Sequence, residues 1–337
     1  MQLKPTLIAH ADLGSAPQKR ALAVACLADG DIYRVLAPQQ VVNPAHLLDD
    51  LSAHAGPAGS LLVGFDFPIG LPLHYANKVG VQDFKSFIID LGDGDGKIFS
   101  QVASTPEEIS LQRPFYPLRS GTSKQSHLLQ ALGAASMDDL RRLCERAGID
   151  ETGITHRAAC PLFWTLGGQQ VGKAAIHGWS QVIGPALRSP SIQARLWPFD
   201  GDLNELIRPG HLVIAETYPA EFYHHLGVRF STHKTGLKTG KRVQSERAAN
   251  ASLLLEWARR NQIAIAPDLE CMLINGFGKS SNADDYFDAV VGLFGMLNII
   301  AGNHPGGGPE DERVRKIEGW ILGKCHPFKQ MAQTDKG

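Results

Sequence analysis

Residues 60–66 read Ser60-Leu61-Leu62-Val63-Gly64-Phe65-Asp66, a strongly apolar run that ends abruptly in an acid. Pro68 and Gly70 follow shortly after it, and both residues are typical of turns. We therefore expect a β-strand over residues 60–65. The carboxylate of Asp66 is then expected at the edge of a sheet, where clefts form.

The segments that precede this run indicate the fold class. Apolar stretches at residues 6–11, 20–27 and 32–36 predict three strands, and the turn sequence Asp29-Gly30-Asp31 joins the last two. A helix is expected from Asn43-Pro44 to about residue 54. The resulting order, β-β-β-α-β, predicts an α/β protein in which a hairpin sheet is followed by a crossover helix.

The rest of the chain predicts a second part of the same core. A short strand is expected at residues 211–215, and Pro219 then opens a helix. Further helices are expected over residues 245–260 and 281–300, and the intervening region contains helical segments such as residues 137–147. We expect the core to comprise residues 1–72 and 208–325, with a mostly helical insertion at 73–207 and a frayed tail at 326–337.

Composition excludes several classes of protein. The 337 residues include 33 Lys+Arg and 34 Asp+Glu, so the net charge of −1 excludes a protein that coats nucleic acid by bulk positive charge. The five cysteines are widely spaced and form no C-x-x-C motif, which indicates a reducing compartment rather than a disulfide framework or a thiolate zinc site. Apolar runs are too short for a signal peptide or a membrane span. We therefore expect a cytoplasmic protein with no membrane association.

Acidic residues follow three of the expected strands. Asp12 ends the first strand, Asp66 ends the strand at 60–65, and Glu216 ends the strand at 211–215. Each acid alone has a structural alternative, as a turn residue or as the partner of a nearby arginine. Converging buried carboxylates repel one another, however, unless they are paired, protonated or bound to a cation. Together they suggest a divalent metal, and hard oxygen ligands favour Mg²⁺ or Mn²⁺.

The helix expected at 281–300 adds two further acids. Ser281 and Asp284 fit a capping box, which is a sufficient structural explanation for Asp284. Asp288 lies about two turns into the helix, is followed by an apolar run, and shares a face with Asp285. Two carboxylates on one face of an apolar helix indicate metal ligands. The candidate metal ligands are therefore Asp12, Asp66, Asp285 and Asp288.

A basic stretch lies between the strand at 211–215 and this helix. Residues 229–247 hold six Lys or Arg residues against the single acid Glu246. A solvated surface loop is one interpretation of this stretch. The other is an electrostatic contact with phosphate groups, made by residues such as Lys234, Lys238, Lys241 and Arg242.

In four ordered motifs the chain resembles the predicted ribonuclease H-like nuclease family, which is catalogued as a domain of unknown function. The motifs are Asp12 at the end of the first strand, the block Asp66-Phe67-Pro68-Ile69-Gly70-Leu71-Pro72, the block Glu216-Thr217-Tyr218-Pro219-Ala220-Glu221, and the block Asp284-Asp285-Tyr286-Phe287-Asp288-Ala289. The resemblance implies a ribonuclease H-like mixed sheet in the order β-β-β-α-β-α-β-α, with a large helical insertion. It also implies metal-dependent hydrolysis of a phosphodiester in a nucleic acid or a related phosphoester.

In such a site the catalytic residues would be Asp12, Asp66, Glu216, Asp285 and Asp288. Two other classes of function stay open. Residues 167–174 match the P-loop pattern G-x-x-x-x-G-K, but Ala174 replaces the hydroxyl residue that binds Mg²⁺, so a nucleotide-binding phosphotransferase or ATPase is an alternative. A non-catalytic binding or scaffold protein of the same fold is the other.

Overall fold

The structure is a computed structural model that describes residues 4–14, 16–28, 31–91, 96–117, 124–149, 155–165, 171–231 and 239–325. Within these residues the chain divides into two compact units. The sheet unit comprises the described residues of 1–67 and 189–306, and the second unit comprises those of 68–188 and 307–325. Each unit is described by itself below.

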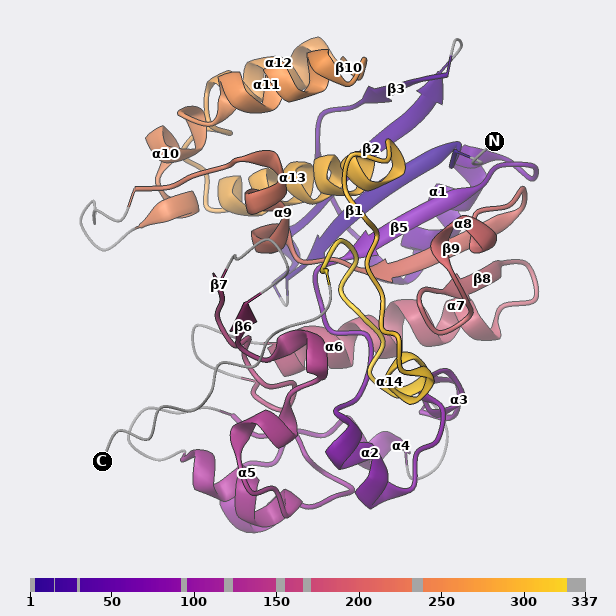
Figure 1. Cartoon of the computed structure of the whole chain (residues 1–337), viewed down its shortest axis with the longest axis vertical. Coiled ribbons are helices and arrows are strands. Elements are labelled where there is room, and N and C mark those ends of the chain that lie inside the picture. The colour runs from indigo at the N-terminus through magenta and orange to yellow at the C-terminus, as the bar shows by residue number, and fades with distance from the viewer. Residues whose placement is uncertain are drawn as a thin grey trace. The chain divides into compact units, whose positions relative to one another are not determined.

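A mixed β-sheet forms the centre of the sheet unit (Figure 1). Its strands are β1 (Leu7–Leu13), β2 (Arg20–Ala28), β3 (Ile32–Val35), β4 (Gln39–Gln40), β5 (Leu61–Phe65), β8 (Gln193–Leu196), β9 (His211–Glu216) and β10 (Ala264–Ile265). They lie in the order β10-β3-β2-β1-β5-β9-β8, and β4 also pairs with β2. Strands β1, β2 and β3 are antiparallel neighbours, whereas β1, β5, β9 and β8 run parallel. The expected α/β class with a mixed sheet is confirmed.

Helices of the sheet unit complete its core. They are α1 (Leu47–Ala55), α8 (Leu203–Leu206), α9 (Pro219–Leu226), α10 (Gln244–Ala248), α11 (Ala251–Arg260), α12 (Pro267–Ile274) and α13 (Ala283–Ile300), with 3-10 turns at η1 (Pro17–Lys19), η2 (Pro44–His46) and η7 (Gly240–Arg242). Helix α13 packs on β1, β2 and α9. From Phe287 to Ile300 every residue of α13 is buried, because apolar side chains cover all of its faces.

The helix expected at 245–260 is wrong in one respect, because the chain forms two helices, α10 and α11. They are separated at Asn250, whose side-chain amide donates to the carbonyls of Glu246 and Arg229. The amide oxygen of Asn250 also accepts from the backbone N–H of Arg229. A side chain that bonds the local backbone in this way competes with helical hydrogen bonding.

The second unit consists mainly of short helices. They are α2 (Leu73–Val79), α3 (Phe84–Asp90), α4 (Gly96–Phe99), α5 (Gln125–Leu132), α6 (Val171–Gly178), the π-helix η6 (Trp179–Ile183), α7 (Gly184–Arg188) and α14 (Glu312–Ile317), with 3-10 turns η3 (Pro106–Glu108), η4 (Met137–Leu140) and η5 (Leu143–Glu145) and the strand pair β6 (Gly148–Ile149) and β7 (Thr155–His156). The helical segment expected at residues 137–147 is therefore two 3-10 turns rather than an α-helix. The backbone N–H of Arg142 donates to the Glu145 carboxylate at 2.9 Å rather than to a carbonyl of the preceding helical turn.

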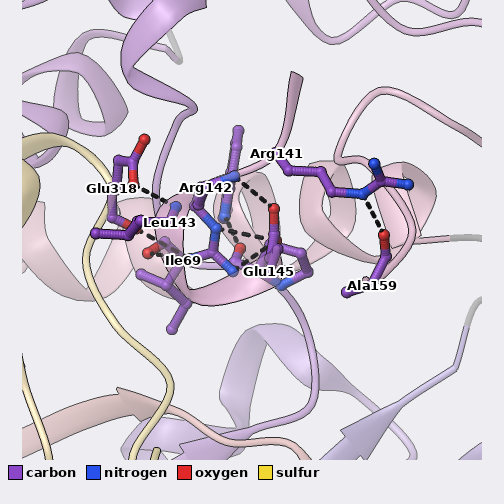
Figure 2. A network of polar contacts seen from close by, with 9 residues as sticks. Ile69, Arg141, Arg142, Leu143, Glu145, Ala159 and Glu318 are labelled. Atoms are coloured by element: carbon purple, nitrogen blue, oxygen red, sulfur yellow. Dashed lines mark hydrogen bonds and ion pairs between the residues drawn. The ribbon is translucent and has the colours of Figure 1, made fainter. Parts of the chain in front are cut away.

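A buried arginine organises this second unit (Figure 2). The guanidinium of Arg142 pairs with Glu145 at 2.8 Å and donates to the backbone carbonyls of Ile69 at 3.1 Å and Glu318 at 3.0 Å. The carboxylate of Glu318 accepts in turn from the backbone N–H of Leu73 at 2.9 Å and of Leu143 at 2.5 Å. Arg142 therefore contacts segments that are 73 and 176 residues away from it in the sequence.

These units differ from the expected division of the chain. The expected insertion at 73–207 includes β8, which pairs with β9 in the central sheet. Residues 307–325, which the sequence predicts as part of the core, group with residues 68–188, where α14 packs on α2 and α3. In the described part of the chain, no helix is both long enough and apolar enough to cross a membrane.

Arg142→Met should destabilise the second unit by about 3–5 kcal/mol, because it leaves the buried Glu145 carboxylate without its cation. Urea denaturation followed by fluorescence would measure the effect. The matched control is Arg260→Met, since Arg260 also pairs with a glutamate, Glu256, but its side chain is 70% exposed. The control should change stability by less than about 0.5 kcal/mol. Equal effects from the two substitutions would contradict the role given to Arg142.

Candidate functional site

Three acids lie at one edge of the central sheet, as the sequence predicts. Ala11 is opposite Phe65 in the parallel pair β1–β5, and Phe65 is opposite Glu216 in the parallel pair β5–β9. The backbone N–H of Asp66 donates to the carbonyl of Ala11 at 3.2 Å. Because parallel strands end at the same edge, Asp12, Asp66 and Glu216 follow one another across it.

Helix α13 approaches the sheet closely, and two glycines permit this approach. A Cβ atom on Gly292 would lie 2.3 Å from Nε2 of His10 in β1, and one on Gly295 would lie 2.1 Å from the ring of Phe222 in α9. Burial lowers the pKa of His10 to about 3, so the ring beneath the helix is neutral. The close contacts hold the middle of α13 against β1 and α9, and the first turns of the same helix carry Asp285 and Asp288.

The carboxylates of the two strands and of α13 interact electrostatically. Burial raises the pKa of Asp12 well above its usual value, and the charges of Asp66, Asp288 and Asp285 raise it further. Lys241 opposes this change. The sheet edge and the first turns of α13 therefore place these four carboxylates within electrostatic range of one another, and the name carboxylate cluster is used for Asp12, Asp66, Asp285 and Asp288.

The remaining members of the cluster show the same pattern. Burial raises the pKa of Asp66 to about 7; Lys241 lowers it, and Asp288 and Glu216 raise it. Burial is also the main reason for the raised pKa values of Asp285 and Asp288. Glu216 is 4% exposed and Asp288 is 1% exposed, whereas Asp12 and Asp66 are partly buried. A cation would relieve this repulsion.

Two lysines and a tyrosine contact the cluster. The ammonium of Lys241 forms an ion pair with Oδ2 of Asp288, and the hydroxyl of Tyr223 donates to Oδ1 of the same carboxylate. Lys19 pairs with Asp285 at 3.0 Å and with Asp284 at 3.4 Å. It reaches them from η1, the turn that directly follows the strand of Asp12.

Sequence reasoning missed Lys19 and Tyr223. A lysine in the turn after a strand carries no functional signal by itself, because its partners on α13 are more than 260 residues away. Tyr223 had a weak signal, since it lies on the helix that Pro219 opens and is two residues beyond the end of the Glu216–Glu221 motif. The structure identifies both residues by their contacts.

The structure describes only two of the four residues expected to contact phosphate. Lys241 points its ammonium at Asp288, and Arg242 is exposed beside it in η7. Lys234 and Lys238 lie outside the described residues. The sequence similar to a P-loop also lies partly outside them, since Gly167 to Gln170 are not described and Lys173 lies in α6.

The chemistry of the cluster suits a hard divalent cation. Its potential ligands are carboxylate oxygens, which are the donors that Mg²⁺ and Mn²⁺ prefer. Burial is the main cause of their raised pKa values, and the negative charges of neighbouring acids add to it. Among the described residues, no group of three or more acidic, histidine or cysteine side chains is gathered in the arrangement of a metal site.

Comparison with known proteins adds no assignment, since no family model, no curated protein and no solved structure matches the chain.

Asp66→Asn should stabilise the metal-free protein at neutral and higher pH. The pKa of Asp66 is about 7 in the folded protein, whereas its ordinary value is 3.8. The contribution of Asp66 to the free energy of unfolding is therefore fully present below pH 3.8 and is lost as the pH rises through 7. At pH 8 the wild type keeps a repelled charge that asparagine lacks. The free energy of unfolding of the variant should therefore be higher by about 1–3 kcal/mol.

Urea denaturation in a chelator at pH 5 and pH 8 would measure this difference, which should be smaller at pH 5. The control Asp268→Asn changes an exposed acid on α12 and should leave the pH dependence unchanged. A variant that is less stable than wild type at pH 8 would show that the Asp66 carboxylate supports the fold, contrary to this prediction.

Proposed function

We propose that the chain is a metal-dependent hydrolase of phosphodiester bonds, acting on a nucleic acid or a related phosphoester. The observation that supports this most directly is the carboxylate cluster. Its acids come from two parallel strands and from one apolar helix, and they raise the pKa of one another. A purely structural role gives no reason to collect repelling charges at the edge of a sheet.

The succession of elements also supports the proposal. Apart from the two-residue strand β4, which precedes α1, strands β1, β2 and β3, helix α1 and strand β5 follow one another, and β9 and α9 come later in the same unit. This succession fits the order that the ribonuclease H-like resemblance implies. The sequence motifs of that resemblance coincide with the ends of β1, β5 and β9 and with the start of α13.

In the proposed site, Mg²⁺ or Mn²⁺ would be held by Asp12, Asp66, Asp285 and Asp288. Such ions supply an activated water and stabilise the leaving oxygen. Glu216, buried next to Asp66, would orient the water or add a ligand. The basic residues Lys241 and Arg242, with Lys234 and Lys238, would neutralise the charge of the phosphate.

Asp12→Asn and Asp288→Asn should each lower kcat/KM by at least about a hundredfold, since each removes a proposed ligand of the metal ion that would activate the water and stabilise the leaving oxygen. The assay is hydrolysis of a panel of DNA, RNA, branched and nucleotide substrates with Mg²⁺ and with Mn²⁺. Asp268→Asn is the matched control and should keep wild-type activity. Metal binding by calorimetry is measured in parallel.

Two outcomes would separate the proposal from its alternatives. Hydrolysis that survives both substitutions would place catalysis outside the cluster. The absence of both hydrolysis and metal binding in the wild type would contradict the proposal and favour a binding or scaffold protein.

A nucleotide-binding P-loop instead predicts that Lys173→Ala abolishes nucleotide binding, and the proposed nuclease site would be unaffected by that change.

A further inference from the structure

Both oxygens of the Asp288 carboxylate already have partners within the protein. Tyr223 donates its hydroxyl to Oδ1, and Lys241 directs its ammonium to Oδ2. Asp288 is 1% exposed, so water cannot readily take the place of either partner. A metal ion that binds Oδ2 would therefore be repelled by the ammonium of Lys241 at the same oxygen, and this repulsion opposes binding of both cations at once.

The backbone around Lys241 is held in place independently of this ion pair. The buried guanidinium of Arg247, on α10, donates to the backbone carbonyl of Lys241. The same guanidinium donates to the carbonyls of Gly276 at 2.8 Å and Gly278 at 2.7 Å. Since Arg247 fixes η7 next to α13, the position of the lysine beside Asp288 is built into the fold.

The side chain of Lys241 can nevertheless leave. It is 41% exposed, whereas its partner Asp288 is almost completely covered, and a lysine stem has several rotatable bonds. Its charge also acts on Asp66 and Asp12, both candidate ligands of the same metal. Lys241 thus provides one positive charge at a place where the proposed ions would provide more.

We propose that Lys241 is an internal counter-cation, which neutralises Asp288 in the metal-free protein and competes directly with the divalent metal for that carboxylate. This inference rests on the proposed function. It assigns to Lys241 a role in setting the metal affinity of the site, which differs from a contact with phosphate. The competing explanation is a permanent structural ion pair that metal binding leaves intact.

The test is calorimetric titration of the full chain with Mn²⁺ in the absence of any substrate. Lys241→Met removes the competing cation, so the Kd for Mn²⁺ should fall about tenfold relative to wild type. Lys241→Gln serves as a second variant with a polar side chain and should show the same change. The rise in melting temperature caused by a fixed Mn²⁺ concentration should also be larger for both variants.

Lys279→Met is the matched control, because it removes the same charge from an exposed position in the sheet unit. Its Kd should stay within about twofold of the wild-type value. Equal Kd values for wild type and both Lys241 variants would overturn the inference but would leave the proposed function standing. Weaker Mn²⁺ binding by the variants would also overturn the inference. If no form of the protein binds Mn²⁺, the inference and the proposed function fail together.

Discussion

Parallel pairing of β1 with β5 places the carboxylates of Asp12 and Asp66 side by side at one edge of the sheet. The repulsion between them is a cost that the backbone topology imposes, because Asp12 and Asp66 each directly follow the paired residues Ala11 and Phe65. Glu216 of β9 lies opposite Phe65, one position before Asp66 in the register. The charges and contacts around this edge, including the positions of Lys19 and Lys241, are most simply understood as responses to that repulsion.

Helix α13 adds to the same constraint rather than relieving it. Its glycines allow its backbone to lie directly on His10 and Phe222, which fixes the helix without regard to the charges that it carries. Apolar packing of residues 287–300 therefore stabilises an arrangement that places Asp288 among other acids. Burial of apolar side chains provides the stability that lets a fold tolerate such a local cost.

The strand ends were predictable from the sequence, because an apolar run that stops at an acid defines both the strand and its last side chain. The strands at 60–65 and 211–215 and the helix at 281–300 lie within two residues of the observed elements. The contacts of Lys19 were not predictable, since they join residues far apart in the chain. The break between α10 and α11 at Asn250 was not predictable for a related reason. The amide of Asn250 donates to the carbonyl of Arg229, which lies outside both helices.

The division of the chain was the least predictable feature. Strand β8 is only four residues long, and its place beside β9 depends on a pairing that no local pattern signals. Residues 307–325 group with the second unit, where α14 packs on α2 and α3 and where Arg142 donates to the carbonyl of Glu318. A buried arginine with partners this distant has no signature in composition or periodicity.

The chain is nearly neutral overall, and at the carboxylate cluster two lysines likewise balance part of the negative charge of the acids. Lys19 reaches the acids from η1, and Lys241 reaches them from η7. Each lysine therefore neutralises a different carboxylate of α13, because Lys19 pairs with Asp285 and Lys241 pairs with Asp288. Lys19 also contacts the backbone carbonyl of Ser281 and Asp284, which suits a role in fixing the start of α13. Lys241 has a more exposed side chain and a more deeply buried partner. In the proposed metal site, that asymmetry favours Lys241 over Lys19 as the cation that competes with the metal ion.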